Sequence, residues 1–319
     1  MKTISTAFLA TSLLLTACDD PTVKQWFDPD RTFASLPQPE IKGINATEEQ
    51  LAIEATQKGD FKRASQFYEQ LVGSKKGSPE EVLRYKLGLA ESARRLGEND
   101  RALAMFSQLT KENPDNLDAH EGRALTLTAT GKTTDAGREF SDILAKDPKR
   151  WRTLNALGIL FTSKNMIPEA MAYYTEALKY SPDNVAVLNN VGLAQAIDRQ
   201  YAAAIEALGQ ASRLSKSPAQ RQQVDLNLAM VYGASGDLDT ASDVAGKYLS
   251  GPALDNNLGL YAHLSKNDAL AKTYLNMALS QSPVYYERAW ENLDVVNDSD
   301  SGTTGSGASN APEAQIKKR

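Results

Sequence analysis

The stretch of residues 151–184, WRTLNALGILFTSKNMIPEAMAYYTEALKYSPDN, contains two helical patterns separated by a short turn. An apolar stripe at helical spacing runs through its first half and is made by Leu154, Leu157, Gly158 and Phe161. A second stripe follows in the other half, at Ala170, Tyr173, Tyr174, Ala177 and Leu178. Such spacing predicts amphipathic helices, and Pro182 ends the second because proline cannot continue a helix. The stretch therefore predicts two antiparallel helices joined by a turn at Asn165 and Met166.

The same pattern recurs along the chain, with an alanine at the equivalent place of seven segments. These alanines are Ala64, Ala102, Ala136, Ala170, Ala204, Ala241 and Ala271. Successive members of this set lie 38, 34, 34, 34, 37 and 30 residues apart. A period near 34 residues with helical patterning is typical of stacked helix-turn-helix repeats. The sequence therefore predicts an all-α fold of about seven such units.

Residues and spacing resemble the tetratricopeptide repeat, in which small residues occupy the eighth and twentieth places of each unit. Gly158 and Ala170 hold these places in the stretch quoted above, where the two helices should cross most closely. The resemblance implies a right-handed solenoid over residues 45–283 with a concave groove lined by first helices, because single units cannot bury their apolar faces alone. The units are expected to begin near Asn45, Leu83, Leu117, Trp151, Val185, Gln222 and Pro252.

Glycine stands at the turn between the two helices of four units, at Gly59, Gly97, Gly131 and Gly236. Glycine suits the left-handed backbone conformation that ends many helices. Asn165 holds this place in the quoted stretch, whereas Arg199 and Lys266 hold it in two other units. The last two turns are therefore expected to be either strained or differently shaped. The sixth unit departs most from the pattern, and its second helix is expected to be short.

The chain changes character after the last repeat. Residues 284–297 predict a capping helix with Tyr286, Trp290 and Leu293 on its apolar side. Residues 298–319 are mostly Gly, Ser, Thr and Ala, with almost no large apolar residue. Such a composition cannot bury enough surface to order itself, so a disordered tail is expected.

The first eighteen residues resemble a bacterial lipoprotein signal. Lys2 gives a positive start, residues 7–15 form a short apolar core, and Leu15-Thr16-Ala17-Cys18 follows. This tetrapeptide matches the lipobox at all four positions, and Cys18 is the one cysteine in the sequence. We therefore expect a signal peptide over residues 1–17 and a membrane anchor of acyl chains on Cys18.

Residues 18–44 would then form a proline-rich tether between the lipid anchor and the repeats. Prolines keep such a segment extended and semi-rigid. Trp26, Phe27 and Phe33 are unusual in a pure spacer. Three roles are open for these aromatic residues: they dock on the first repeat, occupy the groove or lie near the bilayer surface.

Composition and motifs argue against two classes of function. The net charge is -5 and no Lys/Arg stripe follows the helices, which argues against a nucleic-acid partner. His120 and His263 lie in the third and seventh units, too far apart to share a metal or a base role. No phosphate loop or nucleophile motif is present, so we expect no enzyme activity, cofactor, metal or small-molecule substrate.

Asparagine and arginine side chains on the first helices are the candidate partner-binding residues. The asparagines are Asn155, Asn189, Asn190, Asn227, Asn256 and Asn257. Asn190, Asn227 and Asn257 recur at the sixth place of successive units, although asparagine is a mediocre helix former. A carboxamide both donates and accepts, so two roles are open: holding an extended peptide backbone, or bonding to neighbouring helices. Arg84 and Arg152 hold groove-facing second places, where they would either pair with a ligand carboxylate or stay solvated.

A narrower resemblance covers roughly residues 151–275. The runs 187–193 (VLNNVGL), 204–208 (AIEAL), 225–233 (DLNLAMVYG) and 256–261 (NNLGLY) are similar to the TadD lipoproteins of the tight-adherence (Flp) pilus system. The resemblance implies a periplasm-facing scaffold that captures a component of the pilus secretion machine, the secretin or its accessory proteins, during assembly. The alternative is a general envelope adaptor that recruits peptidoglycan enzymes or proteases.

Two signals disagree about which membrane holds the protein. Asp19 and Asp20, directly after the cysteine, resemble the signal that retains lipoproteins of many enteric bacteria in the inner membrane. Action near a secretin favours the outer membrane instead. Because the retention rule varies between bacterial groups, the outer membrane is slightly favoured.

Overall fold

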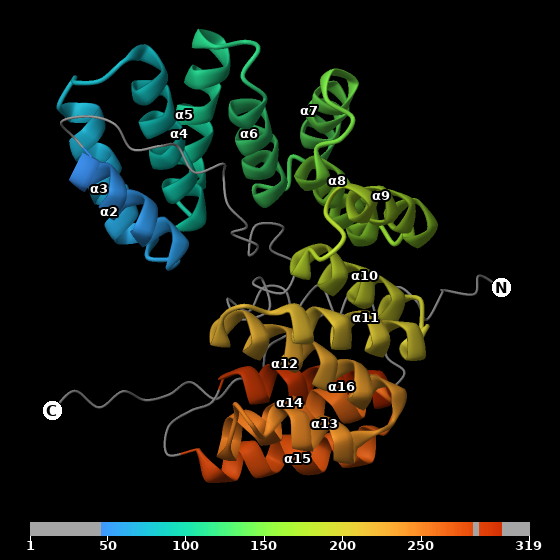
Figure 1. The fold of residues 1–319 in the computed structure, drawn as a ribbon. Helices are drawn as coiled ribbons and strands as arrows, with labels where there is room; N and C mark the ends of the chain where they lie inside the picture. The colour runs from blue at the N-terminus through green and yellow to red at the C-terminus, as the bar shows by residue number, and fades with distance from the viewer. Residues whose placement is uncertain (1–45, 283–286, 302–319) are drawn as a thin grey trace, which may run out of the picture. The chain divides into compact units, whose positions relative to one another are not determined.

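The computed structural model describes residues 46–282 and 287–301, and every regular element in these ranges is an α-helix (Figure 1). The predictions for the signal peptide, Cys18, the tether and the tail beyond residue 301 lie outside the described residues. The helices are α2 (Ala46–Gln57), α3 (Phe61–Gly73), α4 (Pro79–Arg95), α5 (Asn99–Glu112), α6 (Leu117–Ala129), α7 (Thr133–Lys146), α8 (Trp151–Ser163), α9 (Ile167–Tyr180), α10 (Val185–Ile197), α11 (Tyr201–Leu214), α12 (Pro218–Ser235), α13 (Leu238–Ala245), α14 (Gly251–Leu264), α15 (Asp268–Gln281) and α16 (Glu287–Ser301).

The described residues divide into two compact units, the first ending at residue 227 and the second beginning at residue 228, so the boundary falls within α12. In the first unit, consecutive helices from α2 to α11 pack against one another, so each helix pair also contacts the next pair. In the second unit, α14 packs on α13 and α15, and α16 packs on α14 and α15. The predicted all-α fold of helix pairs is confirmed.

Five of the seven units begin within one residue of the predicted starts, and two begin four residues earlier. The prediction was late at Leu83 and at Gln222 because local capping signals precede the apolar stripes in α4 and α12. The Ser78 side chain accepts a hydrogen bond from the Glu81 amide at 3.3 Å, and Glu81 accepts from the Ser78 amide at 2.6 Å. This reciprocal capping box, followed by Pro79 in the first turn, starts α4 before its first apolar residue.

The recurring alanines form the centre of the packing. Each of the seven is completely buried: Ala64, Ala102, Ala136, Ala170, Ala204, Ala241 and Ala271. Gly158 shows why the facing helix also needs a small residue, since a Cβ atom built there would lie 2.3 Å from the ring of Tyr174. The predicted close crossing of α8 and α9 at Gly158 is therefore confirmed.

The turns within the repeats use one backbone conformation whatever residue occupies them. Gly97 and Gly131 both have φ of 76°, in the left-handed region. Asn165, Arg199 and Lys266 have φ of 58°, 61° and 67° in the equivalent turns. Of the two alternatives for Arg199 and Lys266, the structure shows the strained one, because a side chain with a Cβ atom adopts this region at a cost.

The last repeats show the predicted short helix and a cap that differs from the prediction in detail. α13 has eight residues, against fourteen in α15. In α16 the buried stripe is Ala289, Leu293 and Val296, whereas Trp290 is 38% exposed. The placement of Trp290 on the packed side was wrong, because the buried stripe runs through Ala289, Leu293 and Val296 and leaves Trp290 beside it. α16 also continues through Ser301, so residues 298–301, assigned to the tail, lie in a helix.

Candidate functional site

Four of the candidate asparagines form a chain of side-chain hydrogen bonds across three first helices of the first unit. Asn190 Nδ2 on α10 donates to Asn155 Oδ1 on α8 at 3.0 Å. Asn227 Nδ2 on α12 donates to Asn189 Oδ1 on α10 at 2.7 Å. Asn189 Nδ2 lies 3.4 Å from Asn190 Oδ1 and links the two bonds. We call Asn155, Asn189, Asn190 and Asn227 the amide relay, in which the bonds are donated in one order, from Asn227 to Asn189, then to Asn190 and then to Asn155.

The amide relay is buried, and most of its hydrogen-bonding capacity is used internally. Its four side chains belong to residues with 0–6% of their surface exposed. Among the described residues, the two atoms at its ends, Asn155 Nδ2 and Asn227 Oδ1, have no hydrogen-bond partner. An unpaired buried amide group costs about 1–3 kcal/mol, so the internal bonds matter for stability. Of the two roles left open by the sequence, this geometry favours the one in which the amides join neighbouring helices.

The remaining two asparagines lie in the second unit and make different bonds. Asn256 Oδ1 accepts from Asn292 Nδ2 at 2.9 Å, which joins α14 to α16. Asn257 Nδ2 donates to the carbonyl of Ala253 in its own helix at 2.8 Å. The recurring sixth place of the repeat therefore carries no single role, since Asn190 and Asn227 bond between helices and Asn257 bonds within one.

Arg84 and Arg152, the two candidate arginines, both have neighbours in the structure. Arg84 donates to Glu49 Oε1 from Nε at 2.9 Å and from Nη2 at 2.6 Å. Glu49 is 3% exposed and also accepts a bond of 3.2 Å from the hydroxyl of Tyr85. Burial and the charge of Glu49 raise the pKa of Tyr85 to about 12. The guanidinium of Arg152 lies 5.4 Å from the centre of the Trp151 ring. A ligand carboxylate at Arg84 would have to compete with Glu49, and pairing with a ligand remains a prediction for both arginines.

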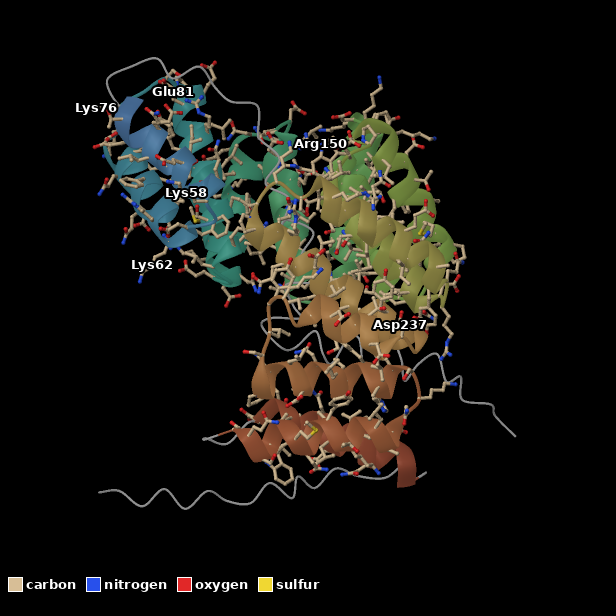
Figure 2. All side chains as sticks on the ribbon, turned by 60° about the horizontal axis from the view of Figure 1, so that its bottom comes forward. Lys58, Lys62, Lys76, Glu81, Arg150 and Asp237 are labelled. Atoms are coloured by element: carbon tan, nitrogen blue, oxygen red, sulfur yellow. The ribbon has the colours of Figure 1, made fainter. Side chains whose placement is uncertain are left out.

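A partly buried ion-pair group between α6 and α8 was missed in the sequence. Arg150, marked in Figure 2 and placed just before α8, donates to Asp118 Oδ1 at 2.5 Å and to Glu121 Oε2 at 3.1 Å. Thr153 donates to the other oxygen of Glu121. Burial alone would lower the pKa of Arg150, but the charges of Glu121 and Asp118 reverse this and raise it. Glu121, Asn155 and Asn189 are each 34 residues apart and hold the fifth place of their units. This recurrence of polar residues could have indicated a polar contact between first helices.

His120 belongs to a second polar group, on the side of α6 that faces α5 and α7. Its Nδ1 lies 2.8 Å from Glu139 Oε1, and its Nε2 lies 3.0 Å from the carbonyl oxygen of Pro114. Arg123 donates to both oxygens of Glu139 at 2.9 Å and to the hydroxyl of Thr110 at 2.8 Å. His263 pairs with Asp268 at 2.5 Å in the second unit. In the described ranges, no group of three or more His, Cys, Asp or Glu side chains is placed to hold a metal ion.

A cavity of about 820 Å³ adjoins this second group, and we call it the α5–α7 pocket. Its apolar lining comes from all three helices and includes Leu103, Leu117, Leu127 and Ile143. Its charged lining on α7 is Asp135, Arg138, Glu139, Asp142 and Lys146. No hydrogen bond or ion pair joins α5 to α7 across the described residues, whereas Arg101 on α5 pairs with Glu69 on α3. An ion pair therefore connects α3 to α5, whereas no such pair among the described residues connects α5 to α7 beside the pocket.

Comparison with known proteins identifies the repeat. The family model described as tetratricopeptide repeat matches residues 87–150 and 155–220. No curated protein matches the chain.

Several solved structures share the fold at low sequence identity. A tetratricopeptide repeat protein from Parabacteroides merdae has a TM-score of 0.52 and 17% identity, covering 79% of this chain and 99% of its own. PilF of Pseudomonas aeruginosa has a TM-score of 0.51 and 19% identity over 66% of this chain and 96% of its own. PilW, described as a widely conserved type IV pilus biogenesis factor, has a TM-score of 0.54 and 23% identity over 66% of this chain and 98% of its own. At these identities the likeness establishes the fold alone.

Proposed function

We propose, from the premise that this chain is built of tetratricopeptide repeats, that it is a protein-binding scaffold of the bacterial envelope that assists assembly of a pilus. The repeats themselves carry the proposal. Matched repeats span residues 87–150 and 155–220, and the helices of the first unit pack as successive pairs. Such stacks present extended surfaces to protein partners, so a scaffold is the function that the fold supports.

The proposed location rests on the N-terminal sequence. Residues 15–18, LTAC, follow a short apolar core and resemble a lipobox, so Cys18 is proposed as the lipidated residue. Within the described ranges, no helix has both the length and the apolarity needed to cross a bilayer. Acyl chains on Cys18 would therefore attach the repeats to a membrane, with the outer membrane favoured slightly over the inner.

The proposed process is assembly of a tight-adherence (Flp) pilus at or near its secretin. The resemblance of residues 151–275 to TadD supports this process. Two proteins with the same fold, PilF and the biogenesis factor PilW, carry pilus-related names, which is consistent with it. The alternative, a general adaptor that recruits peptidoglycan enzymes or proteases, requires the same fold and anchor.

The proposed mechanism is capture of a partner segment on a preformed surface. A rigid stack loses little conformational freedom on binding, whereas the partner segment becomes ordered. Because the amide relay is buried and bonded internally, it would fix the spacing of α8, α10 and α12 rather than make most of the partner contacts. Partner specificity then depends on the exposed side chains around the relay.

A deletion strain tests the proposal in the cell. The strain is complemented with the wild-type chain, with Cys18→Ser or with an Asp19→Ser/Asp20→Ser variant, and surface pilin and secretin multimers are measured. We expect wild type to restore both and Cys18→Ser to restore neither, with an unacylated precursor that stays uncleaved at residue 18 and is tethered only by its short signal core. Full pilus assembly without the protein would refute the pilus role. A mature N-terminus other than Cys18, determined by mass spectrometry, would refute the anchor while leaving the scaffold intact.

A further inference from the structure

We propose that the α5–α7 pocket binds the aromatic segment of this chain's own tether, centred on Trp26 and Phe27. The pocket and the amide relay lie on different helices, and binding of the tether does not depend on the pilus role. The segment lies outside the described residues, and the chain enters the described part at Ala46.

The pocket combines an apolar floor with charged residues of both signs along one side. Leu103 on α5, Leu117 and Leu127 on α6 and Ile143 on α7 supply the apolar lining. Asp135, Arg138, Asp142 and Lys146 follow α7 at spacings of three and four residues, so they lie on one face of that helix. A ligand suited to this pocket has large apolar side chains with opposite charges close beside them.

The tether sequence PTVKQWFDP, residues 21–29, has that composition. Val23, Trp26 and Phe27 stand at i, i+3 and i+4, the spacing of one helical face. Lys24 and Asp28 stand four residues apart and have opposite charges. The same separation divides Arg138 from Asp142 on α7, so Lys24 can face Asp142 while Asp28 faces Arg138. Docking of a short amphipathic segment in an apolar groove is a recurring mode of recognition.

The connecting chain is long enough for the segment to reach the pocket. Eighteen residues separate Phe27 from Ala46, and at about 3 Å per residue they span up to about 54 Å. Packed helices lie about 8–10 Å apart, so α6 is at most about 40 Å from α2 along the stack. A tether of this kind also holds its segment at about millimolar effective concentration, which favours self-docking over capture of a dilute partner.

Self-docking would shorten the connection between the repeats and the membrane. With Trp26 held in the pocket, seven residues remain between it and the proposed anchor at Cys18, or about 25 Å at full extension. With Trp26 released, the whole tether of residues 18–44 is available, about 80 Å. This consequence rests on the proposed lipidation, whereas the docking itself does not.

Fluorescence of Trp26 as the sole tryptophan tests the docking in a soluble protein. The chain from residue 18 is prepared with Cys18→Ser, Trp151→Phe and Trp290→Phe, and a peptide of residues 19–45 gives the reference for exposed Trp26. We expect the protein to emit at shorter wavelength than the peptide and to resist quenching by acrylamide. Added peptide should displace the segment only near millimolar concentration.

Pocket variants identify the binding place. Leu103→Asp, and Ser107→Arg as a variant at a half-buried polar position, should shift the emission to that of the free peptide while circular dichroism stays helical. Met171→Asp is the matched control, because Met171 follows Ala170 on α9 as Leu103 follows Ala102 on α5. Emission equal to that of the peptide in the starting protein, or an equal shift with Met171→Asp, would overturn the proposal. Protection that appears only as protein concentration rises would assign the occupant to a second copy and also overturn it.

Discussion

Replacing Asn190 by alanine separates the structural role of the amide relay from a role in partner binding. Asn190 is 3% exposed and bonds to Asn155 and Asn189. The substitution leaves Asn155 Oδ1 without its donor, next to an Nδ2 that already has no partner among the described residues. It also removes the acceptor of Asn189 Nδ2. At about 1–3 kcal/mol for each orphaned buried group, with some relaxation, the free energy of unfolding should fall by about 2–4 kcal/mol.

The assay combines urea unfolding with hydrogen exchange, because a repeat array can open in parts. Amide exchange in α8 and α10 should accelerate more than exchange in α14. Asn276→Ala is the control, since Asn276 is exposed and bonds to the Lys272 carbonyl in its own helix at 2.8 Å. Its effect should stay within about 0.5 kcal/mol. In the double variant Asn155→Ala/Asn190→Ala, the coupling should be about 1–2 kcal/mol, because the second change removes a group already orphaned by the first.

A loss of less than about 0.5 kcal/mol with Asn190→Ala would refute this reasoning, because the relay would then contribute no stability. A pull-down of the partner, performed on the same variant, decides the alternative. Unchanged stability with lost capture assigns the amides to the ligand. Lower stability with capture retained by the remaining folded protein assigns them to the fold.

Three further perturbations test the packing, the turns and the buried tyrosines. Gly158→Ala places a Cβ atom 2.3 Å from the Tyr174 ring, so despite the better helix propensity of alanine it should destabilise by about 1–3 kcal/mol in a urea melt. Arg199→Gly should stabilise by about 1 kcal/mol, since φ of 61° is left-handed backbone, and Gly131→Ala should do the opposite. Between pH 10 and 12 the folded chain keeps the Tyr85 proton while the unfolded chain loses it. The free energy of unfolding should therefore fall as pH rises through this range, and Tyr85→Phe should flatten the slope.

Much of the fold could be predicted because every unit must meet the same packing requirements and therefore has similar residues at equivalent places. Ala170 and its counterparts are predictable because only a small residue fits where two helices cross. The left-handed turns were visible as glycines, and Arg199 and Lys266 adopt the same conformation because the packing of the two helices fixes the turn. Helix starts were less predictable, since the capping box at Ser78 acts locally and lies outside the 34-residue period.

The candidate site was predictable in composition but not in connectivity. The sequence shows asparagines at recurring places of the first helices, yet the same residue type makes an interhelical bond at Asn190 and an intrahelical one at Asn257. The difference depends on which side chain of the neighbouring helix lies opposite the asparagine. The sequence pattern of a single helix does not contain this information. The α5–α7 pocket could not be predicted from the pattern of one helix, because its lining residues come from three helices.

The polar groups of the first helices have a further physical consequence for how the repeats stack. Apolar contacts between repeats draw on the same few side-chain types, namely alanine, aliphatic residues and aromatic rings, so they discriminate poorly between one neighbouring repeat and another. The polar contacts do discriminate: Glu121 meets Arg150, Asn155 meets Asn190, and Asn189 meets Asn227. A stack that skipped a repeat would bury the carboxylate of Glu121 against an amide, and leave the amides of the relay unpaired at about 1–3 kcal/mol each. The free-energy cost of mismatched polar pairs would then select the native order of the repeats. The buried alanines and their apolar neighbours stabilise every interface between repeats alike.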